Sequence, residues 1–287
     1  MRPEDILVPT PSGVCCKRGG FYIDPTRPVE KALITHGHSD HARAGHGAVL
    51  ATQETLDLMR LRYGENFAGT AQAVGYGETV SLGGARVTFH PAGHVLGSAQ
   101  IAVEANGLRI VAAGDYKDVA DPTCTPFELV QCDVFITEAT FGLPVFRHGD
   151  PDAEIAKLLH SVALFPERGH LVGAYSLGKT QRVIALIRKA GYDKPIYLHG
   201  AMETITRYYE SRGIALGDLR DLRAHPLRRV HHRGDLRPPG VPPPGHGKRD
   251  RPAAPPPPRR PEPLRAGRGL CARQGATHHH RASGARA

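Results

Sequence analysis

The segment ITHGHSDH, residues 34–41, places three histidines and one aspartate in six positions, residues 36–41, which directly follow the apolar segment KALIT. An apolar run of this length favours a β-strand, and side chains two residues apart in an extended chain point the same way. His36 and His38 are therefore placed to bind one metal ion. Asp40 and His41, where the chain turns into its next element, are free to reach a second ion. Two ions need more ligands, so the fold must bring other residues to this strand end.

Three further residues can complete such a site. His94 lies in HPAGHVLGSAQ, a glycine-containing loop between two predicted strands, and Asp115 ends the apolar strand of VAAGD. A carboxylate at that place can bridge two cations, and the mixture of imidazole and carboxylate suits zinc, with manganese as an alternative. Asp24, in FYIDP, precedes the first ligand strand. We expect it to orient a histidine ring rather than to bind metal. The alternative for all three is an ordinary polar residue in a loop.

Residues 1–223 alternate short apolar segments with glycine-containing turns and amphipathic segments, which is typical of an α/β fold. The predicted strands are residues 31–36, 48–52, 85–90, 99–105, 108–115, 133–140, 169–176 and 194–200. The predicted helices are residues 52–64, 152–164, 176–191 and 201–213. In the third helix we expect Ser176 to be the N-cap and Gly191 to end the helix. From about Gly142 the pattern becomes a strand–helix alternation, which indicates a second α/β unit.

The composition changes abruptly after Arg223. Residues 224–287 hold 14 of the 37 basic residues but only 3 of the 28 acidic ones, and 43 of their 64 residues are Pro, Arg, Ala or Gly. The first 223 residues carry a net charge of −2, so the overall charge of +9 is no argument that they bind nucleic acid. The last 64 residues contain no Phe, Tyr, Trp, Ile or Met. With so little to bury, this segment is predicted to be disordered.

Two interpretations of this tail stay open. One is a basic Pro-rich interaction tail. The other, which we prefer, is GC-rich DNA translated out of frame, because Pro, Arg, Ala and Gly have codons that begin with two G or C bases. Sequencing the gene around the codons for Asp218 to Pro226 distinguishes the two.

The cysteines and the N-terminal residues bear on the compartment. Five cysteines, with Cys15 and Cys16 adjacent, form no disulfide framework, and the N-terminal residues contain no apolar run typical of a signal peptide. No segment of the sequence is apolar enough for a membrane span. We therefore expect a cytoplasmic protein with reduced thiols and no membrane contact.

Several of these motifs resemble those of a known family. THGHSDH, PAGHVLGSAQ and AAGD resemble the metal-binding motifs of the metallo-β-lactamase fold. ITEATFG and AYSLGKTQR resemble segments of its β-CASP branch, whose members cleave nucleic acids. Together with FYIDP, THGHSDHARAGHGAVLAT, EATFGLPVFRH and YLHGAM, they are most similar to the bacterial DNA-ligase-associated exonuclease family, over about residues 5–223. RNA 3′-end processing factors share most of these motifs.

The resemblance implies a fold and a ligand set. The implied fold is a metallo-β-lactamase αββα sandwich in residues 1–141 and a partial β-CASP-like α/β domain in residues 142–223. The basic Pro/Arg-rich tail in residues 224–287, predicted to be disordered from its composition, follows them. The implied ligands form two groups bridged by an aspartate: His36, His38 and His94 for one zinc, Asp40 and His41 for the other, and Asp115 between them. The predicted catalytic carboxylates are Asp40, Asp115 and Glu138, of which Glu138 orients or assists the site.

The chain also departs from the family pattern. The resemblance implies two more histidines after the inserted domain, one that assists catalysis and one that completes the second metal site. The histidines that follow Arg223 lie outside any strand–turn context: His225, His231, His232, His246 and His278–His280. We therefore expect the second metal site to be incomplete and the chain to be impaired as a hydrolase.

The predicted activity is phosphodiester hydrolysis at a two-metal site. Lys179, Thr180 and Arg182, near the start of a predicted helix, are the expected contacts to the phosphate backbone, and the alternative is an ordinary capped surface helix. The expected substrate is DNA, and the resemblance implies a pathway link to an ATP-dependent DNA ligase. The alternatives are a β-CASP ribonuclease acting on RNA, a small-molecule hydrolase such as a thioesterase or lactonase, and an inactive metal-binding remnant.

Overall fold

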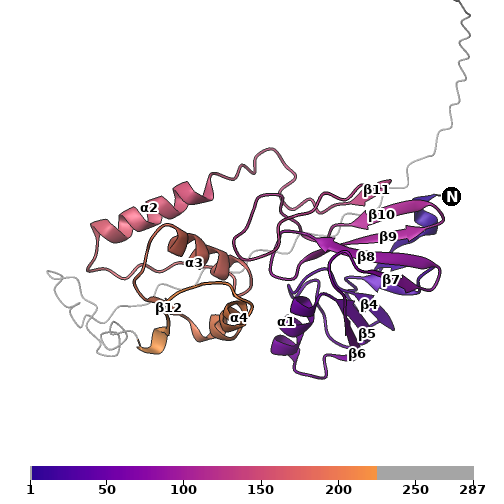
Figure 1. The fold of residues 1–287 in the computed structure, drawn as a ribbon, viewed down its shortest axis with the longest axis horizontal. Coiled ribbons are helices and arrows are strands. Elements are labelled where there is room, and N and C mark those ends of the chain that lie inside the picture. The colour runs from indigo at the N-terminus through magenta and orange to yellow at the C-terminus, as the bar shows by residue number, and fades with distance from the viewer. Residues whose placement is uncertain (1, 225–287) are drawn as a thin grey trace, which may run out of the picture. The chain divides into compact units, whose positions relative to one another are not determined.

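The computed structural model of the chain, drawn in Figure 1, describes residues 2–224. Its first sheet contains six strands in chain order. A short 3-10 helix, Pro3–Asp5, precedes it, and the strands are β1 (Leu7–Thr10), β2 (Gly13–Cys16), β3 (Phe21–Ile23), β4 (Lys31–Leu33), β5 (His46–Ala51) and β6 (Ala68–Ala73). The pairs from β1 to β3 are antiparallel and those from β3 to β6 are parallel. Parallel neighbours need a crossover connection, and helix α1 (Gln53–Tyr63) supplies it between β5 and β6.

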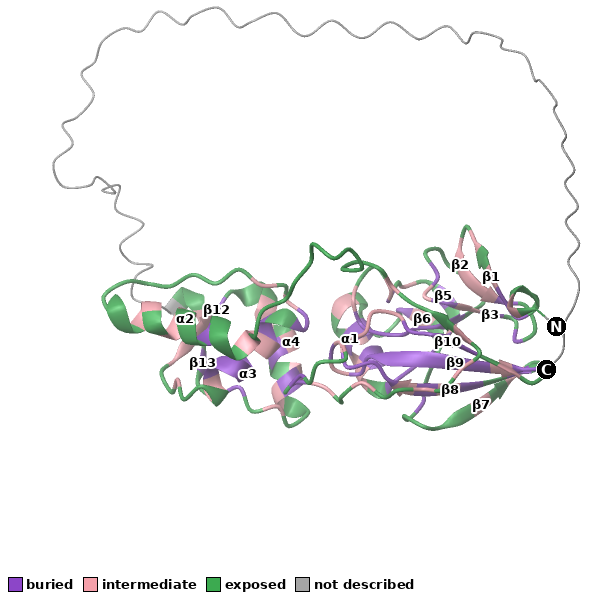
Figure 2. Cartoon of the chain, turned by 90° about the horizontal axis from the view of Figure 1, so that it is seen from above, coloured by how far each residue is buried: buried purple, intermediate pink, exposed green. Residues whose placement is uncertain are grey.

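The second sheet contains five strands in the order β11-β10-β9-β8-β7. These are β7 (Thr79–Leu82), β8 (Ala85–Pro91), β9 (Ala99–Ala105), β10 (Leu108–Ala112) and β11 (Val134–Ile136). All neighbours are antiparallel except β10 and β11, which are parallel. The central strand, β9, is buried along nearly its whole length (Figure 2).

An apolar core lies between the two sheets. Alternate residues of β8, Ala85, Val87 and Phe89, are buried in it, as the two-residue period of a strand requires. Phe21 and Leu33 reach the same core from the first sheet. A fully buried Leu or Phe contributes roughly 1.5–3 kcal/mol to stability. This core therefore holds the ends of the two sheets, and the loops that follow them, in a fixed relation.

Helix α1 covers the other face of the first sheet. Its N-cap, Thr52, accepts a hydrogen bond from a backbone N–H of the first turn, and Gly64 with φ of 82° ends it. Leu56 and Met59 pack against Val49 of β5 in a second apolar cluster. β5 thus directs Val49 toward α1 and the adjacent Leu50 into the core between the sheets.

The last part of the described chain is mainly helical. It consists of α2 (Pro151–Leu164), α3 (Lys179–Lys189), β12 (Ile196–Leu198), α4 (Gly200–Ser211), β13 (Leu219–Asp221) and a 3-10 turn, Leu222–Ala224. β12 and β13 form a parallel pair. The backbone N–H of Leu96, in the loop before β9, donates to the buried Tyr209 hydroxyl at 3.2 Å, and the Tyr208 hydroxyl donates to Asp57 of α1 at 2.9 Å. These bonds tie α4 to the loop before β9 and to α1.

The α/β class and all four predicted helices are confirmed, and β9 has the predicted bounds. The strand predicted at residues 169–176 is wrong: no strand forms there, and Leu171 is 94% exposed. An apolar run becomes a strand only where another strand edge takes up its backbone hydrogen bonds, and β12 and β13 pair with each other instead. The predicted cap of α3 is also wrong, because Gly178 caps the helix and its N–H donates to the Gln181 side chain at 2.8 Å.

Two predictions about organisation remain as they were. The boundary at residues 141/142 stays a prediction, and the tail after Ala224, with its histidines, lies outside the described residues. Within residues 2–224, no helix combines the length and the apolar character that a bilayer crossing requires.

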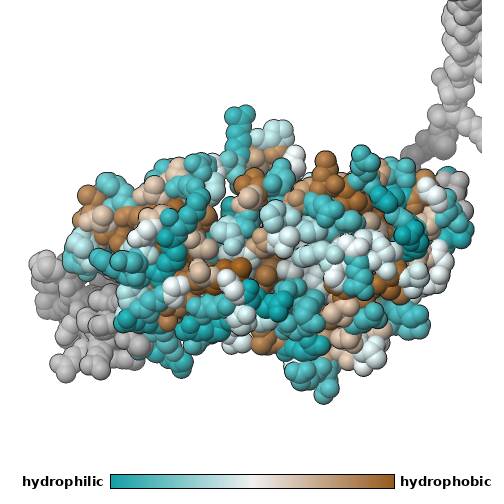
Figure 3. Space-filling model, viewed as in Figure 1, coloured by the Kyte–Doolittle hydropathy of each residue, from teal (hydrophilic) through white to brown (hydrophobic). Residues whose placement is uncertain are grey.

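Most of the exposed large apolar side chains in the described residues lie between residues 129 and 175. Brown patches also interrupt the polar face in Figure 3. The exposed side chains include Phe135 and Ile136 of β11, which is an edge strand, and the residues Leu129, Phe141, Leu143, Val145, Phe146, Leu171 and Tyr175. An exposed apolar edge strand can accept another strand.

Candidate metal centre

Two histidines enter the centre directly from the first sheet. The backbone N–H of Ile34 donates to the Leu50 carbonyl at 3.0 Å, which keeps the chain extended beyond the end of β4. His36 is fully buried, and His38, two residues further, is partly exposed. Their facing atoms, His36 Nε2 and His38 Nδ1, are 2.9 Å apart. The two rings therefore point to one place, as the spacing predicted.

Loops of the second sheet bring the other two members of this group. The loop between β8 and β9 carries His94, and the Ser98 hydroxyl oxygen accepts hydrogen bonds from the backbone N–H groups of His94 and Val95 at 3.0 and 3.2 Å. Asp115 follows β10 after a turn at Gly114, whose φ is +58°. A Cβ at Gly114 would lie 2.7 Å from Thr35 Oγ1. Glycine is therefore needed for the close approach of the two sheets at this point.

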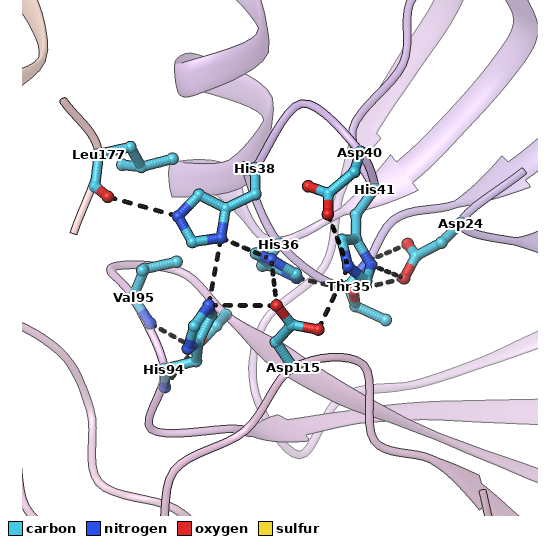
Figure 4. Close-up of polar contacts among 12 residues, drawn as sticks. Asp24, Thr35, His36, His38, Asp40, His41, His94, Val95, Asp115 and Leu177 are labelled. Atoms are coloured by element: carbon cyan, nitrogen blue, oxygen red, sulfur yellow. Dashed lines mark hydrogen bonds and ion pairs between the residues drawn. The ribbon is translucent and has the colours of Figure 1, made fainter. Parts of the chain in front are cut away.

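Four side chains form one group around a common point (Figure 4): His36, His38, His94 and Asp115. One ligand atom from each lies within 4.8 Å of all the others. His94 Nε2 is 3.1 Å from His38 Nδ1, and Asp115 Oδ2 is 3.5 Å from His94 Nε2 and 3.7 Å from His36 Nε2. A tetrahedral zinc with bonds of about 2.0–2.1 Å holds its ligands about 3.4 Å apart. The spacing of this group therefore fits a zinc ion.

A second group lies on the other side of Asp115. His41 Nε2 is 3.2 Å from Asp115 Oδ1 and 3.8 Å from Asp40 Oδ2, and the Asp40 side chain is 73% exposed. Asp115 thus directs one oxygen to each group, as a bridging carboxylate would. His41 Nδ1 is 2.8 Å from Asp24 Oδ2. Asp24 therefore contacts the far side of the His41 ring and not the common point of the first group (Figure 4).

Electrostatics separate the two groups. Burial lowers the pKa of His36, His38 and His94, the last to about 4. These rings are neutral at pH 7, the form in which imidazole binds a metal. Burial also lowers the pKa of His41, but its hydrogen bonds with Asp115 and Asp24 outweigh burial and raise that pKa to about 10. The hydrogen bond with His41 in turn lowers the pKa of Asp115. In the metal-free chain, His41 therefore holds a proton that a second ion would have to displace.

Comparisons with known proteins agree with this chemistry. No protein-family model matches the chain. It is 31% identical over 214 residues to a "Probable DNA ligase" from Opitutus terrae, a match that covers 70% of this chain and 20% of that protein. It is 30% identical over 188 residues to an endoribonuclease YSH1 from Gibberella zeae, which covers 62% of this chain and 22% of the relative. It is 24% identical over 213 residues to an RNase J-like protein from Methanocaldococcus jannaschii, which covers 64% of this chain and 51% of the relative.

The chain belongs to the metallo-β-lactamase/β-CASP family. It spans about a fifth of the length of the first two relatives and about half of the third.

Glu138 is the remaining carboxylate expected to act in this metallo-β-lactamase/β-CASP site. Glu138 follows β11, and its negative charge acts to raise the pKa of His94 against the larger effect of burial. It has no ion pair among those found in residues 2–224. The charge of Glu138 is therefore close enough to act on His94, but Glu138 is not a member of the first ligand group.

The three residues expected to contact phosphate differ in whether their side chains are exposed or already engaged in other contacts. Lys179 is exposed, with its Nζ 5.1 Å from the centre of the Tyr175 ring. Thr180 is buried, and its hydroxyl donates to the Tyr175 carbonyl at 2.6 Å. Arg182 Nε lies 3.3 Å from the buried carboxylate of Asp121. Lys179 alone therefore combines a charge with an exposed position.

Two contacts of this β-CASP-family site were missed from the sequence. The Leu177 carbonyl accepts from His38 Nε2 at 3.3 Å, which leaves Nδ1 of that ring to face the other ligands. Thr35, directly before His36, places its hydroxyl beside both His36 and Asp24. Its position next to the first ligand was the one signal in the sequence. No signal indicated Leu177, because it acts through its backbone.

Proposed function

We propose that this chain binds divalent metal ions at the two groups of the candidate centre and acts as a metal-dependent nuclease on phosphodiester bonds of DNA. The observation that carries the proposal is the single carboxylate of Asp115, which has one oxygen toward each histidine-containing group. In this arrangement, two ions bound at the two groups would lie close together on either side of that carboxylate, as two-metal hydrolysis of phosphate esters requires.

The proposed ligands of the first ion are His36, His38, His94 and Asp115, and those of the second are Asp40, His41 and Asp115. Neutral imidazoles and an ionised carboxylate form a donor set that suits zinc, with manganese as the alternative. Bound there, two such ions would activate water for attack and offset the negative charge on the attacked phosphate.

The protein's own residues have distinct proposed roles around those ions. Asp24 orients the His41 ring through its Nδ1. Asp40, exposed and at the edge of the second group, and Glu138, close to His94, are the carboxylates available to exchange protons with the reacting groups. Lys179, exposed at the first position of α3, is the proposed contact to the phosphate backbone.

We further propose that the two sheets with α1 are the metallo-β-lactamase sandwich of residues 1–141. We propose that residues 142–223 are a partial β-CASP domain. Among the described residues, the exposed apolar side chains of β11 and of the stretch that follows it support a sheet edge that is not covered by residues 2–224. The free thiols of the four described cysteines suit the cytoplasm, the proposed place of action.

The proposal extends to the state of this particular chain. In residues 2–224 the second group contains only Asp40, His41 and the shared Asp115. A catalytic site of this kind needs a full set of ligands for the second ion and a group that transfers the proton. The 287-residue chain is therefore proposed to be an impaired nuclease, and a form with an uninterrupted reading frame after Arg223 is proposed to be active.

DNA is the first candidate substrate, because one relative is named a probable DNA ligase and the motifs resemble a ligase-linked exonuclease. A functional link to an ATP-dependent DNA ligase is part of this proposal. RNA is the second candidate, because other relatives are named endoribonuclease YSH1 and RNase J-like protein.

The test is hydrolysis of DNA and RNA oligonucleotides labelled at either end, with zinc or manganese and with a chelator. DNA shortening that the chelator and His38→Ala both abolish supports the proposal, while cleavage of RNA alone moves the assignment to the second candidate. Cleavage that survives both treatments overturns the metal-dependent mechanism. Degradation by the 287-residue chain at the rate of the uninterrupted form overturns the proposed impairment.

A further inference from the structure

Thr35 lies at the junction of the two ligand groups, and its backbone is fixed from both sides. Its N–H donates to Asp24 Oδ1 at 2.8 Å, and its carbonyl accepts from the N–H of Ala99, the first residue of β9, at 2.8 Å. The residue is 1% exposed. The threonine therefore has one stable position, between the first sheet and the second.

The hydroxyl of Thr35 has two neighbours, and the direction of both hydrogen bonds follows from chemistry. Its Oγ1 is 2.6 Å from Asp24 Oδ2 and 3.1 Å from His36 Nδ1. A hydroxyl has one proton, and a carboxylate can only accept. The hydroxyl therefore donates to Asp24 and accepts from the Nδ1–H of His36.

This direction fixes the form of the His36 ring. With its proton on Nδ1, the neutral ring has its lone pair on Nε2, the atom that is 2.9 Å from His38 Nδ1 and 3.7 Å from Asp115 Oδ2. His36 is fully buried, so no water can replace the hydroxyl as an acceptor without a rearrangement. Thr35 thus decides which nitrogen of His36 faces the first ion.

The same carboxylate oxygen also serves the second group. Asp24 Oδ2 is 2.8 Å from His41 Nδ1, and His41 directs Nε2 toward Asp115. One continuous chain of hydrogen bonds therefore runs from His36 through Thr35 and Asp24 to His41. On the opposite side, Asp115 also links the two histidines, because one of its oxygens faces His36 and the other faces His41.

We propose that Thr35 is a positioning residue that fixes His36 as the Nδ1–H tautomer and couples the two ion sites through Asp24. The proposal rests on the metal centre of the proposed function and not on its nuclease activity. Removing such a partner of a ligating histidine typically costs about 10–100-fold in metal affinity.

The test compares Thr35→Val, which removes the hydroxyl, with Thr35→Ser, which keeps it. Thr206→Val is the matched control, because Thr206 is also fully buried and its hydroxyl accepts one hydrogen bond, from Gln181 at 2.8 Å, outside the metal centre. Zinc affinity of the full 287-residue chain is measured by competition with a chromophoric chelator. We expect Thr35→Val to bind zinc about 10–100-fold more weakly, and Thr35→Ser and Thr206→Val to stay close to the wild type.

A second measurement needs no variant. Nitrogen-15 NMR of the histidine rings in the metal-free wild-type chain reports which nitrogen of His36 is protonated. Protonation at Nδ1 supports the proposal, and protonation at Nε2 overturns it even if Thr35→Val fails to fold. Wild-type zinc affinity in a folded Thr35→Val also overturns it and leaves the metal centre intact. A wild-type chain that binds no zinc overturns the metal centre itself.

Discussion

Replacing Asp115 with Asn tests the bridging arrangement, because it removes one negative charge and changes the shape of the side chain very little. In the wild type, Asp115 Oδ1 lies 3.2 Å from His41 Nε2. Asp115 Oδ2 lies 3.5 Å from His94 Nε2 and 3.7 Å from His36 Nε2. A single substitution should therefore weaken both groups, whereas a substitution in either histidine group alone would weaken one.

The size of the effect on His41 follows from its pKa, which is about 10 instead of the ordinary 6.5. At about 1.4 kcal/mol for each pKa unit, the carboxylates of Asp115 and Asp24 favour the protonated ring by roughly 5 kcal/mol beyond the opposing effect of burial. The hydrogen bond with Asp115 is the largest of the contributions that raise this pKa. In Asp115→Asn we therefore expect the pKa of His41 to fall by about two units, and zinc affinity of the first group to fall about 100-fold.

The assay is an NMR titration of the histidine rings in the metal-free chain, together with zinc competition against a chelator. Asp118→Asn is the control, since it makes the same charge change three residues away at an exposed position. An Asp115→Asn variant in which His41 still titrates near pH 10 would show that Asp115 does not hold that ring. Unchanged zinc affinity would refute the reasoning for the first group.

Three further predictions concern pH, packing and phosphate binding. His41, with a pKa of about 10, must lose its proton to bind metal, so affinity for a second ion should rise about tenfold for each pH unit between pH 7 and 9. Affinity for the first ion should change little, because the rings that bind it are already neutral. Isothermal titration calorimetry at each pH measures both affinities, and an affinity for the second ion that does not change with pH would contradict the assignment. Gly114→Ala should destabilise the fold by about 1–3 kcal/mol, because φ at this residue is +58° and the new Cβ would lie 2.7 Å from Thr35 Oγ1. Urea unfolding measures the change in stability. An unfolding midpoint equal to that of the wild type would contradict this prediction. Lys179→Ala should weaken binding of single-stranded DNA and should reduce the slope of log affinity against log salt concentration by the amount of about one phosphate contact. Fluorescence anisotropy at several salt concentrations measures this slope. Equal slopes for the variant and the wild type would rule out the contact.

Local sequence was a sufficient guide where the chemistry depends on neighbours in the chain. The two-residue spacing of His36 and His38 gave a shared direction because an extended backbone repeats every two residues. The predicted bounds of helix α1 are close to the observed ones, because Thr52 caps its first turn and Gly64 ends it, which are both local features of the chain. The strand predicted at residues 169–176 failed because a strand depends on a partner, which composition cannot reveal.

The sequence by itself determined which imidazoles and carboxylates are available to the candidate centre, and that the side chains of His36 and His38 can point the same way. Only the tertiary structure decided that the two oxygens of Asp115 face different groups, that the Leu177 carbonyl holds His38, and that Thr35 joins His36 to Asp24. The reason is physical. Covalent spacing sets the direction of side chains a few residues apart, but groups separated by tens of residues meet only when the apolar core between two sheets fixes where their loops end.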